Sequence, residues 1–340
     1  MEAAVLAINA CAWPVLTRLD RDRIGVVYFN KPSHGLEEGD LAALTSVDNG
    51  RTWNPAGLPA PHDAGANRMH IAAGVTPDGR WIVLSSGFKI VDGKYTTQEP
   101  VWSSLRGAGD SPWEIRRRVT VEGAVPRLIP HGRILALPDG RLAATFYCSW
   151  GRGKPGRAWV GFSDDTGITW KGAQPIGGDD ANEIVLLRRA DGAWLAVART
   201  HVDHHLSLHT SPADGQPWTR CGDLTLSMQH PGDLIDLGAD GILLTYGIRN
   251  RGLMAIGLRL SRDGGESWTP PAVLYQFGQA SDCGYPSTVA LSDGELLTAC
   301  YSDFSPVHQG YHLLGIRWRF EEFFVPAALR SMSDGGPLKV

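Results

Sequence analysis

Residues 163–170 read Ser-Asp-Asp-Thr-Gly-Ile-Thr-Trp, and the same spacing of Ser, Asp, Gly, Thr or Ser, and Trp returns at residues 46–53 and 261–268. Weaker copies, which keep a Ser, a Gly and the closing Trp, stand at residues 104–113 and 211–218. The Asp and Gly favour a tight turn, and the hydroxyl residue and Trp pack back over the hairpin. This motif, the Asp box, therefore predicts β-hairpins along the chain and has a folding role rather than a catalytic one.

A second repeat alternates with the Asp boxes. It consists of an apolar run, an Asp-Gly pair and another apolar run, and it is centred on Asp78, Asp139, Asp191, Asp240 and Asp293. Asp-Gly between alternating apolar residues is a strong hairpin signal. Residues 14–30, which turn near residues 20–22, supply a sixth unit. The turns lie roughly 50 to 60 residues apart, the length of one four-stranded propeller blade.

These repeats predict an all-β protein, a six-bladed β-propeller with Asp-box repeats. Residues 1–325 are expected to form this single domain, and residues 326–340 a C-terminal tail. The segment from Ala3 to Ile8 is expected to add an outer strand to the last blade, so that the ring closes and leaves no open sheet edge.

Composition is consistent with many short strands and excludes several classes of protein. The 340 residues are 43% hydrophobic and include 41 Gly, 22 Pro and 12 Trp. With a formal net charge of −4 and no long run of Lys and Arg, nucleic acid is not an expected partner. No apolar run approaches membrane-spanning length, so no membrane association is expected. The chain as given has no signal peptide, which fits a cytoplasmic protein or a trimmed secreted or periplasmic one.

The strand order predicts where a functional site lies. Because strands alternate in direction, the Asp-Gly turns and Asp boxes share one rim, and the starts of inner strands and the ends of second strands share the other. Inner strands are expected to begin with Trp13, His70, His131, Glu183, His230 and Tyr285, and second strands to end near Asn30, Ser86, Tyr147, Arg199, Arg249 and Tyr301. Such a polar ring suits a small polar ligand, or it forms a solvated funnel whose groups bond one another.

With these features in view, the chain resembles the bacterial Asp-box branch of the sialidase superfamily over nearly its whole length. The resemblance rests on the Asp boxes, on Glu183 and Arg199 placed across an Asp-Gly turn, and on the run Gly284-Tyr285-Pro286-Ser287. It implies an exo-acting glycoside hydrolase that cleaves a sialic-acid-like or other carboxylated sugar and needs neither cofactor nor metal. The expected partner is an anionic glycan or oligosaccharide; the oligomeric state is left open.

The resemblance also implies roles for particular residues. Tyr285 would be the nucleophile and Glu183 the base that takes its proton, while Arg199 and Arg249 would grip the sugar carboxylate. A phenol suits this task because a carboxylate nucleophile would be repelled by the substrate carboxylate. The general acid is expected in the loop that holds His34, Glu37, Glu38 and Asp40, with Asp40 favoured.

Two departures from the family pattern widen the choice of substrate. Trp13 stands where sialidases carry their first arginine, and Tyr301-Ser302 where a supporting Glu is usual. A lyase or hydrolase for uronate-bearing glycans is therefore an alternative. In it Arg199 or Arg249 would neutralise the uronate carboxylate, and His70, His131, His230 or Tyr285 would move protons. A non-catalytic glycan-binding propeller, with Trp13 as a stacking platform, is a third.

Further residues have candidate roles of lower specificity. Arg68, Tyr147, Asp282 and Tyr301 are expected to contact the substrate, and Asp282 could instead serve as an acid or cap a strand. The histidines at positions 201, 204, 205 and 209 lack accompanying Cys or carboxylate pairs, so no metal site is predicted there.

Overall fold

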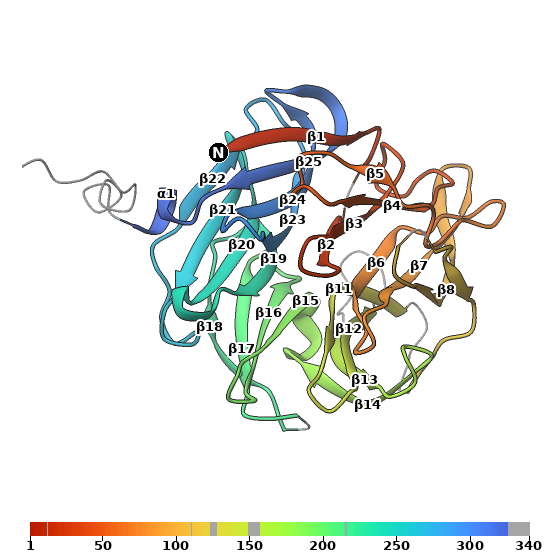
Figure 1. Ribbon diagram of the computed structural model, residues 1–340, viewed down its shortest axis with the longest axis horizontal. Helices are drawn as coiled ribbons and strands as arrows, with labels where there is room; N and C mark the ends of the chain where they lie inside the picture. The colour runs from red at the N-terminus through yellow and green to blue at the C-terminus, as the bar shows by residue number, and fades with distance from the viewer. Residues whose placement is uncertain (12, 110, 123–127, 149–156, 215, 326–340) are drawn as a thin grey trace, which may run out of the picture.

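The computed structural model describes residues 1–11, 13–109, 111–122, 128–148, 157–214 and 216–325. Its sheets stand around a common centre, as in a propeller (Figure 1). Helical structure in the described residues is limited to α1 (Glu321–Phe324) and two short 3-10 turns, Gly178–Asp180 and Gly238–Asp240. None of these is long and apolar enough to cross a membrane. The prediction of an all-β, propeller-like fold is therefore confirmed; residues 326–340, the expected tail, lie outside the described part.

Four sheets have four strands each. Their strands are β2 (Val15–Arg18), β3 (Ile24–Phe29), β4 (Leu41–Ser46) and β5 (Asn54–Pro55); β15 (Ala181–Arg188), β16 (Trp194–Thr200), β17 (Leu206–Ser211) and β18 (Thr219–Asp223); β19 (Gln229–Asp236), β20 (Ile242–Asn250), β21 (Leu253–Ser261) and β22 (Ala272–Gln276); and β23 (Cys283–Ala290), β24 (Leu296–Ser305), β25 (His308–Trp318) and β1 (Glu2–Ile8).

The remaining strands join in one nine-stranded sheet. They are β6 (His70–Val75), β7 (Trp81–Val91), β8 (Lys94–Arg106), β9 (Glu114–Arg116), β10 (Thr120–Val121), β11 (Leu128–Ala136), β12 (Leu142–Cys148), β13 (Arg157–Ser163) and β14 (Thr169–Ile176). The prediction of six separate blades is thus wrong as a count of sheets. The two expected blades merge because residues 132–134 of β11 pair in parallel with residues 72–74 of β6.

The first strands of the repeats form a closed ring. β2, β6, β11, β15, β19 and β23 each contact the next, and β23 contacts β2. The ring closes at the outside as predicted, because β1 pairs antiparallel with β25 and so adds a strand from the N-terminus to the last sheet. Without β1 the edge of β25 would expose unpaired backbone groups.

Each full Asp box forms the expected turn. In the second full box, Asp165 Oδ1 accepts bonds from the backbone N–H groups of Ile168 and Thr169, and Ser163 Oγ accepts one from the Gly167 N–H. Trp170 closes the box, with no exposed surface and with Nε1 donating to the Gly167 carbonyl. The carboxylate replaces bonds that the turn cannot make to a strand, which explains why the motif recurs at hairpins.

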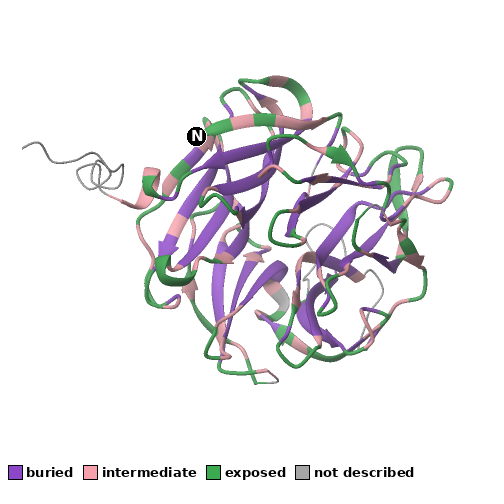
Figure 2. Ribbon diagram, in the orientation of Figure 1, coloured by how far each residue is buried: buried purple, intermediate pink, exposed green. Residues whose placement is uncertain are grey.

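Most residues of the strands are buried (Figure 2), and apolar side chains pack in clusters between neighbouring sheets. Ile129 and Tyr147 of one sheet, for example, share a buried cluster with Ile184 and Trp194 of the next. This continuous packing holds the strand ends at the centre in fixed positions, so polar groups there are held by the scaffold rather than by loops.

Candidate functional site

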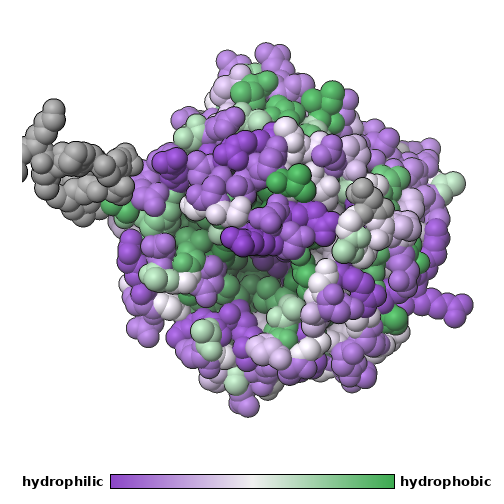
Figure 3. Space-filling model, in the orientation of Figure 1, coloured by the Kyte–Doolittle hydropathy of each residue, from purple (hydrophilic) through white to green (hydrophobic). Residues whose placement is uncertain are grey.

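A cavity of about 470 Å³ opens between the ends of the inner and second strands. Its polar and aromatic lining includes Trp13, His70, His131, Tyr147, Glu183 and Arg199, all predicted from their strand positions, together with Phe88, Tyr95, Asn182 and His201. Figure 3 shows that the molecule is hollowed near the centre of the face it displays. The structure thus brings these six predicted residues together at one cavity.

Two of these lining residues, Trp13 and Glu183, have strained backbone, and so does the neighbouring Tyr285. Trp13, Glu183 and Tyr285 have φ angles of 61°, 42° and 50°, a left-handed region that non-glycine residues rarely occupy. The strand register shifts at Glu183 and again at Tyr285, as at a β-bulge. A bulge re-aims a side chain, and strain of about 1–3 kcal/mol per residue persists only where the surroundings enforce it.

Tyr285, Glu183 and Arg199 form one buried chain of hydrogen bonds. The Tyr285 hydroxyl donates to Glu183 Oε1 over 2.5 Å, and Arg199 Nη1 donates to Glu183 Oε2 over 2.7 Å. Glu183 is 6% exposed and Tyr285 8%. Both carboxylate oxygens are therefore directed, one toward a guanidinium and one toward the phenol.

The charges around this chain fix its protonation. Burial alone would raise the pKa of Glu183, but the charge of Arg199 and the hydrogen bonds from Tyr285 and Arg199 outweigh it and hold the pKa at about 2. Burial, and then the Glu183 charge, raise the pKa of Tyr285, whereas Arg199 and Arg249 oppose this rise. Arg249 lies over the Tyr285 ring, 5.7 Å from its centroid. The resting pair is thus a neutral phenol and a carboxylate, the forms that a nucleophile and its base require.

Arg249 itself is held by groups of this chain. Its Nη2 donates to Asp282 Oδ1 over 2.9 Å and to the Tyr301 hydroxyl, and its Nε donates to the Cys283 carbonyl over 2.6 Å. Tyr301 and Tyr311 also donate to Asp282. The expected carboxylate grip by Arg249 is therefore already filled by Asp282.

Asp282 is also hydrogen-bonded to the ring of His34. The Nε2 atom of His34 lies 2.5 Å from the Oδ2 atom of Asp282. Trp13 connects this group to the cavity, because its ring meets His34 at 5.6 Å and Tyr285 at 5.7 Å, both edge-on. Trp13 thus packs between His34 and Tyr285.

The predicted histidines lie in different settings. His70 and His131 line the cavity, and burial lowers the pKa of both, that of His70 to about 3. His230 is 1% exposed, and its ring lies 5.3 Å from that of His204 in a tilted arrangement. Burial and then Arg199 lower its pKa to about 2. All three are neutral near pH 7.

Two predicted residues point elsewhere. Asp40 accepts bonds from His62 and Asn30, and these hydrogen bonds lower its pKa although burial opposes them. It is therefore an ionised carboxylate with its oxygens occupied, which does not suit the acid role expected for it. Arg68 has no exposed surface, bonds to Ser85 and lies 3.9 Å over the Trp102 ring, so its guanidinium is not offered to a ligand.

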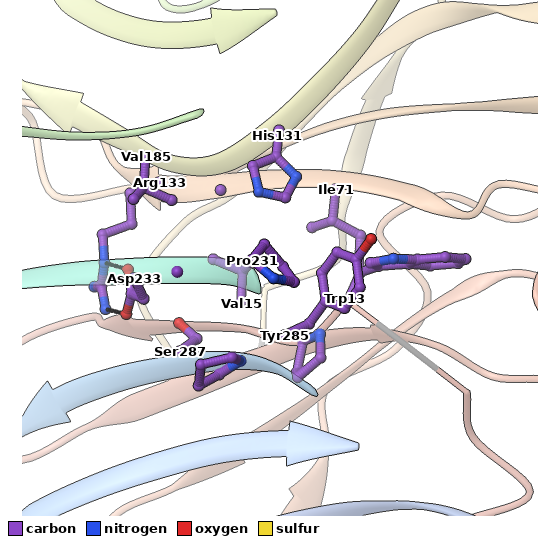
Figure 4. A pocket seen from close by; sticks show the side chains of 14 residues that line it. Trp13, Val15, Ile71, His131, Arg133, Val185, Pro231, Asp233, Tyr285 and Ser287 are labelled. Atoms are coloured by element: carbon purple, nitrogen blue, oxygen red, sulfur yellow. Dashed lines mark hydrogen bonds and ion pairs between the residues drawn. The ribbon is translucent and has the colours of Figure 1, made fainter. Parts of the chain in front are cut away.

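A smaller cavity of about 30 Å³ lies beside Tyr285 and is lined mainly by residues at or near the starts of the inner strands. Figure 4 shows Trp13, His131 and Tyr285 at one end of it and the Arg133–Asp233 pair at the other. Arg133 donates to both Asp233 oxygens, at 2.9 and 2.6 Å, and Asp233 accepts from the Thr288 N–H. This ion pair ties three sheets together below the candidate site.

Several polar atoms at the site have no partner within the described residues. Arg199 Nε, Asn182 Oδ1 and His230 Nδ1 are buried and unbonded there. Buried polar atoms in native proteins nearly always find partners, so these atoms mark capacity for ligand or solvent contacts.

The sequence favoured Asp40 over His34 as the acid and considered His201 only as a metal ligand. It did not single out Asn182, Arg133 or Asp233. It also missed the long hairpin of β7 and β8, which brings Phe88 and Tyr95 to the cavity. The available signal for Arg133 and Asp233 was a charged residue inside each of two otherwise apolar inner strands.

Among the described residues, one group has the composition of a metal site: Cys11, His34 and Asp282, with ligand atoms within 4.8 Å of one another. Arg249 and the tyrosine hydroxyls already saturate Asp282. A guanidinium at this distance repels a cation, so the geometry fits a hydrogen-bonded network better than a metal.

Comparison with known proteins agrees with this arrangement. The BNR repeat-like domain family matches residues 90–298, more than half of the chain, and the chain belongs to that family. No curated protein matches the sequence. The resemblance to the sialidase superfamily is confirmed at the level of repeat family and fold.

Solved structures share the fold at low identity. A Dyadobacter fermentans protein described as of unknown function is 19% identical, with a TM-score of 0.78, and the match covers 94% of this chain and 98% of that one. A Hadza microbial sialidase is 17% identical (TM-score 0.72; 91% and 65% covered), and the Trypanosoma rangeli sialidase is 15% identical (TM-score 0.69; 96% and 57% covered). This chain therefore spans about two thirds or less of the two sialidases.

Proposed function

We propose that this protein is an exo-acting glycoside hydrolase for a carboxylated sugar, with Tyr285 as nucleophile and Glu183 as its base. The observation that carries the proposal is the 2.5 Å hydrogen bond from the Tyr285 hydroxyl to a buried, ionised Glu183 at the cavity. A fold shared with sialidases supports it by analogy. We also interpret the nine-stranded sheet as two merged blades, which makes the propeller six-bladed.

The reaction begins when Tyr285 attacks the anomeric carbon. As the Oη–C bond forms, its proton passes to Glu183 and the glycosidic bond breaks. Arg199 and Arg249 counter the negative charge that develops on the phenol oxygen before the bond is complete. Water then releases the sugar, and Glu183 returns the proton to Tyr285.

Arg199 is the proposed contact for the sugar carboxylate. Although Arg199 bonds Glu183 through Nη1, it lines the cavity and its Nε has no partner within the described residues, whereas Arg249 uses both Nε and Nη2 on groups of this chain. The Nη2 of Arg199 faces His204 Nδ1 at 3.3 Å, away from the bond to Glu183. A guanidinium suits this contact because it presents fixed, paired donors to a planar carboxylate.

The cavity histidines favour a second candidate, a lyase or hydrolase for uronate-bearing glycans. His70 and His131 are neutral and line the same cavity as Arg199, which could neutralise a uronate carboxylate. In such a lyase an imidazole or Tyr285 would take the proton beside that carboxylate, and the product would carry a double bond.

The test is product analysis on α-linked sialosides and on uronate oligosaccharides. We expect a free acidic sugar, and we expect Tyr285→Phe to lower turnover roughly 10³-fold or more. Tyr246→Phe is the matched control, a buried tyrosine of β20 in the core. A product that absorbs in the ultraviolet identifies the lyase, and binding without any product identifies a glycan-binding protein. Turnover unchanged by Tyr285→Phe would overturn the proposal.

A further inference from the structure

The proposed hydrolysis needs an acid as well as a nucleophile. The leaving oxygen must take up a proton as the glycosidic bond breaks, unless the leaving group is already stable as an anion. Tyr285 and Glu183 are engaged on the anomeric carbon. Asp40 has its oxygens bonded to His62 and Asn30 and does not line the cavity.

His34, from the same loop as Asp40, lies at the border of the cavity. Its ring contacts the ring of Trp13, which lines the cavity and contacts Tyr285. A second lining residue, Tyr95, donates its hydroxyl to the His34 carbonyl and holds the loop from the other side. The His34 side chain is 40% exposed, so its ring is open to a ligand while its backbone is fixed.

Asp282 sets the orientation of that ring. His34 Nε2 lies 2.5 Å from Asp282 Oδ2, and no described residue bonds Nδ1. Asp282 is itself fixed by Arg249, Tyr301 and Tyr311. A carboxylate that holds one ring nitrogen fixes the direction in which the other nitrogen points.

We propose that His34 is the general acid and base of this site and that Asp282 is its positioning residue; this rests on the proposed glycosidase function. In the first step Nδ1–H gives its proton to the leaving oxygen while the Tyr285 oxygen binds the anomeric carbon. In the second step Nδ1 takes a proton from the attacking water, whose oxygen displaces Tyr285. The sum is cleavage of one glycosidic bond by one water, with His34, Glu183 and Tyr285 restored.

The alternative is that His34 and Asp282 only fasten the loop. The chain offers a matched control for that role, because His62 Nδ1 bonds Asp40 over 2.6 Å in the same region and lies outside the cavity. A fastening pair affects every substrate alike. An acid is needed mainly when the leaving group is poor.

The experiment compares two leaving groups on one sugar. The wild-type protein, His34→Gln, His62→Gln and Tyr285→Phe are assayed on the 4-nitrophenyl and methyl glycosides of N-acetylneuraminic acid and of glucuronic acid. For His34→Gln we expect kcat/KM on the methyl glycoside to fall about 10²–10⁴-fold, with less than about tenfold loss on the 4-nitrophenyl glycoside. His62→Gln is expected to affect the two glycosides equally. Addition of formate, a small external acid, should restore part of the His34→Gln activity.

The outcomes separate this inference from the function on which it rests. Equal losses on both glycosides in His34→Gln, together with inactive Tyr285→Phe, overturn the acid assignment and leave the nucleophile in place. A Tyr285→Phe variant as active as wild type, or a wild-type protein inactive on all four glycosides, overturns the proposed function and this inference with it.

Discussion

The Tyr285 hydroxyl donates to Glu183 over 2.5 Å although the two residues are 102 positions apart in the chain. Both have positive φ angles, and both stand where an inner strand begins with a shift of register. Two residues with strained backbone are thus joined by one side-chain hydrogen bond. Such strain persists only in a rigid scaffold, which the ring of packed sheets supplies. The site is thereby formed before any ligand arrives, which lowers the reorganisation that a reaction requires.

Buried neutral histidines make the fold sensitive to acid. The folded-state pKa of His70 is about 3 and that of His230 about 2, against 6.5 in an unfolded chain. Below pH 6.5 the unfolded chain therefore binds protons that the folded protein does not. The free energy of unfolding is fully present above pH 6.5 and falls as the pH drops from 6.5 toward 3, by roughly 2 kcal/mol per histidine at pH 5.

Urea unfolding at pH 7.5 and pH 5 measures this loss. His70→Gln should reduce the difference between the two pH values, because glutamine takes up no proton in either state. His308→Gln, at the half-buried start of β25, is the control and should leave the difference as it is. An equal pH dependence in wild type and His70→Gln would contradict the prediction.

We expect the stability of the protein to depend strongly on the balance of charge between Arg133 and Asp233. Asp233 is 4% exposed, and its side chain is matched by Arg133 and the Thr288 N–H. Asp233→Leu should lower the free energy of unfolding by about 3–5 kcal/mol, because it leaves a buried guanidinium without a counter-charge. The double variant Arg133→Met with Asp233→Leu should recover most of that loss. If the double variant is as unstable as the single one, packing rather than charge explains the effect.

A substitution in an Asp box should lower the stability of the protein without lowering its activity. Asp165→Ala removes the acceptor for two backbone N–H groups, those of Ile168 and Thr169. We expect the free energy of unfolding to fall by about 1–2 kcal/mol while kcat and KM stay at wild-type values, because the box lies on the rim opposite the cavity. Thermal unfolding and steady-state kinetics on the same preparation decide this. A change in kcat would assign the box a role at the site.

Local patterns in the sequence predicted the scaffold well. The Asp boxes and Asp-Gly turns are short-range signals, and the structure forms the turns that they specify. Counting a fixed number of residues from each turn also predicted which side chains meet at the cavity, because each residue of a strand advances the chain by a constant distance. These side chains are Glu183, Arg199, His70 and His131. The merging of two blades was not predictable in this way, since it depends on how closely β6 and β11 approach.

The side-chain pairs that join different sheets could not be predicted from the sequence either. Asp282 neutralises Arg249, and Arg133 meets Asp233 a hundred positions away. Such contacts depend on side-chain direction across several sheets, which no local pattern encodes. For the same reason the sequence favoured Asp40 over His34, two residues of one loop whose side chains the structure sends to different partners.

Asp282→Asn should change binding and catalysis in opposite directions. The asparagine keeps the shape and an acceptor for Arg249 but removes the negative charge that now balances that guanidinium. A carboxylated ligand then gains an unbalanced cation beside Tyr285, so titration calorimetry should show N-acetylneuraminate binding about tenfold tighter, a gain of about 1.4 kcal/mol, with a neutral sugar such as methyl glucoside unaffected. The same change weakens the hold on His34, so kcat on the methyl glycoside should fall. Asp40→Asn, a loop carboxylate that also bonds a histidine, should change neither quantity. Unaltered selectivity between the acidic and the neutral sugar in Asp282→Asn would show that Arg249 is too far from the bound carboxylate for its charge to matter.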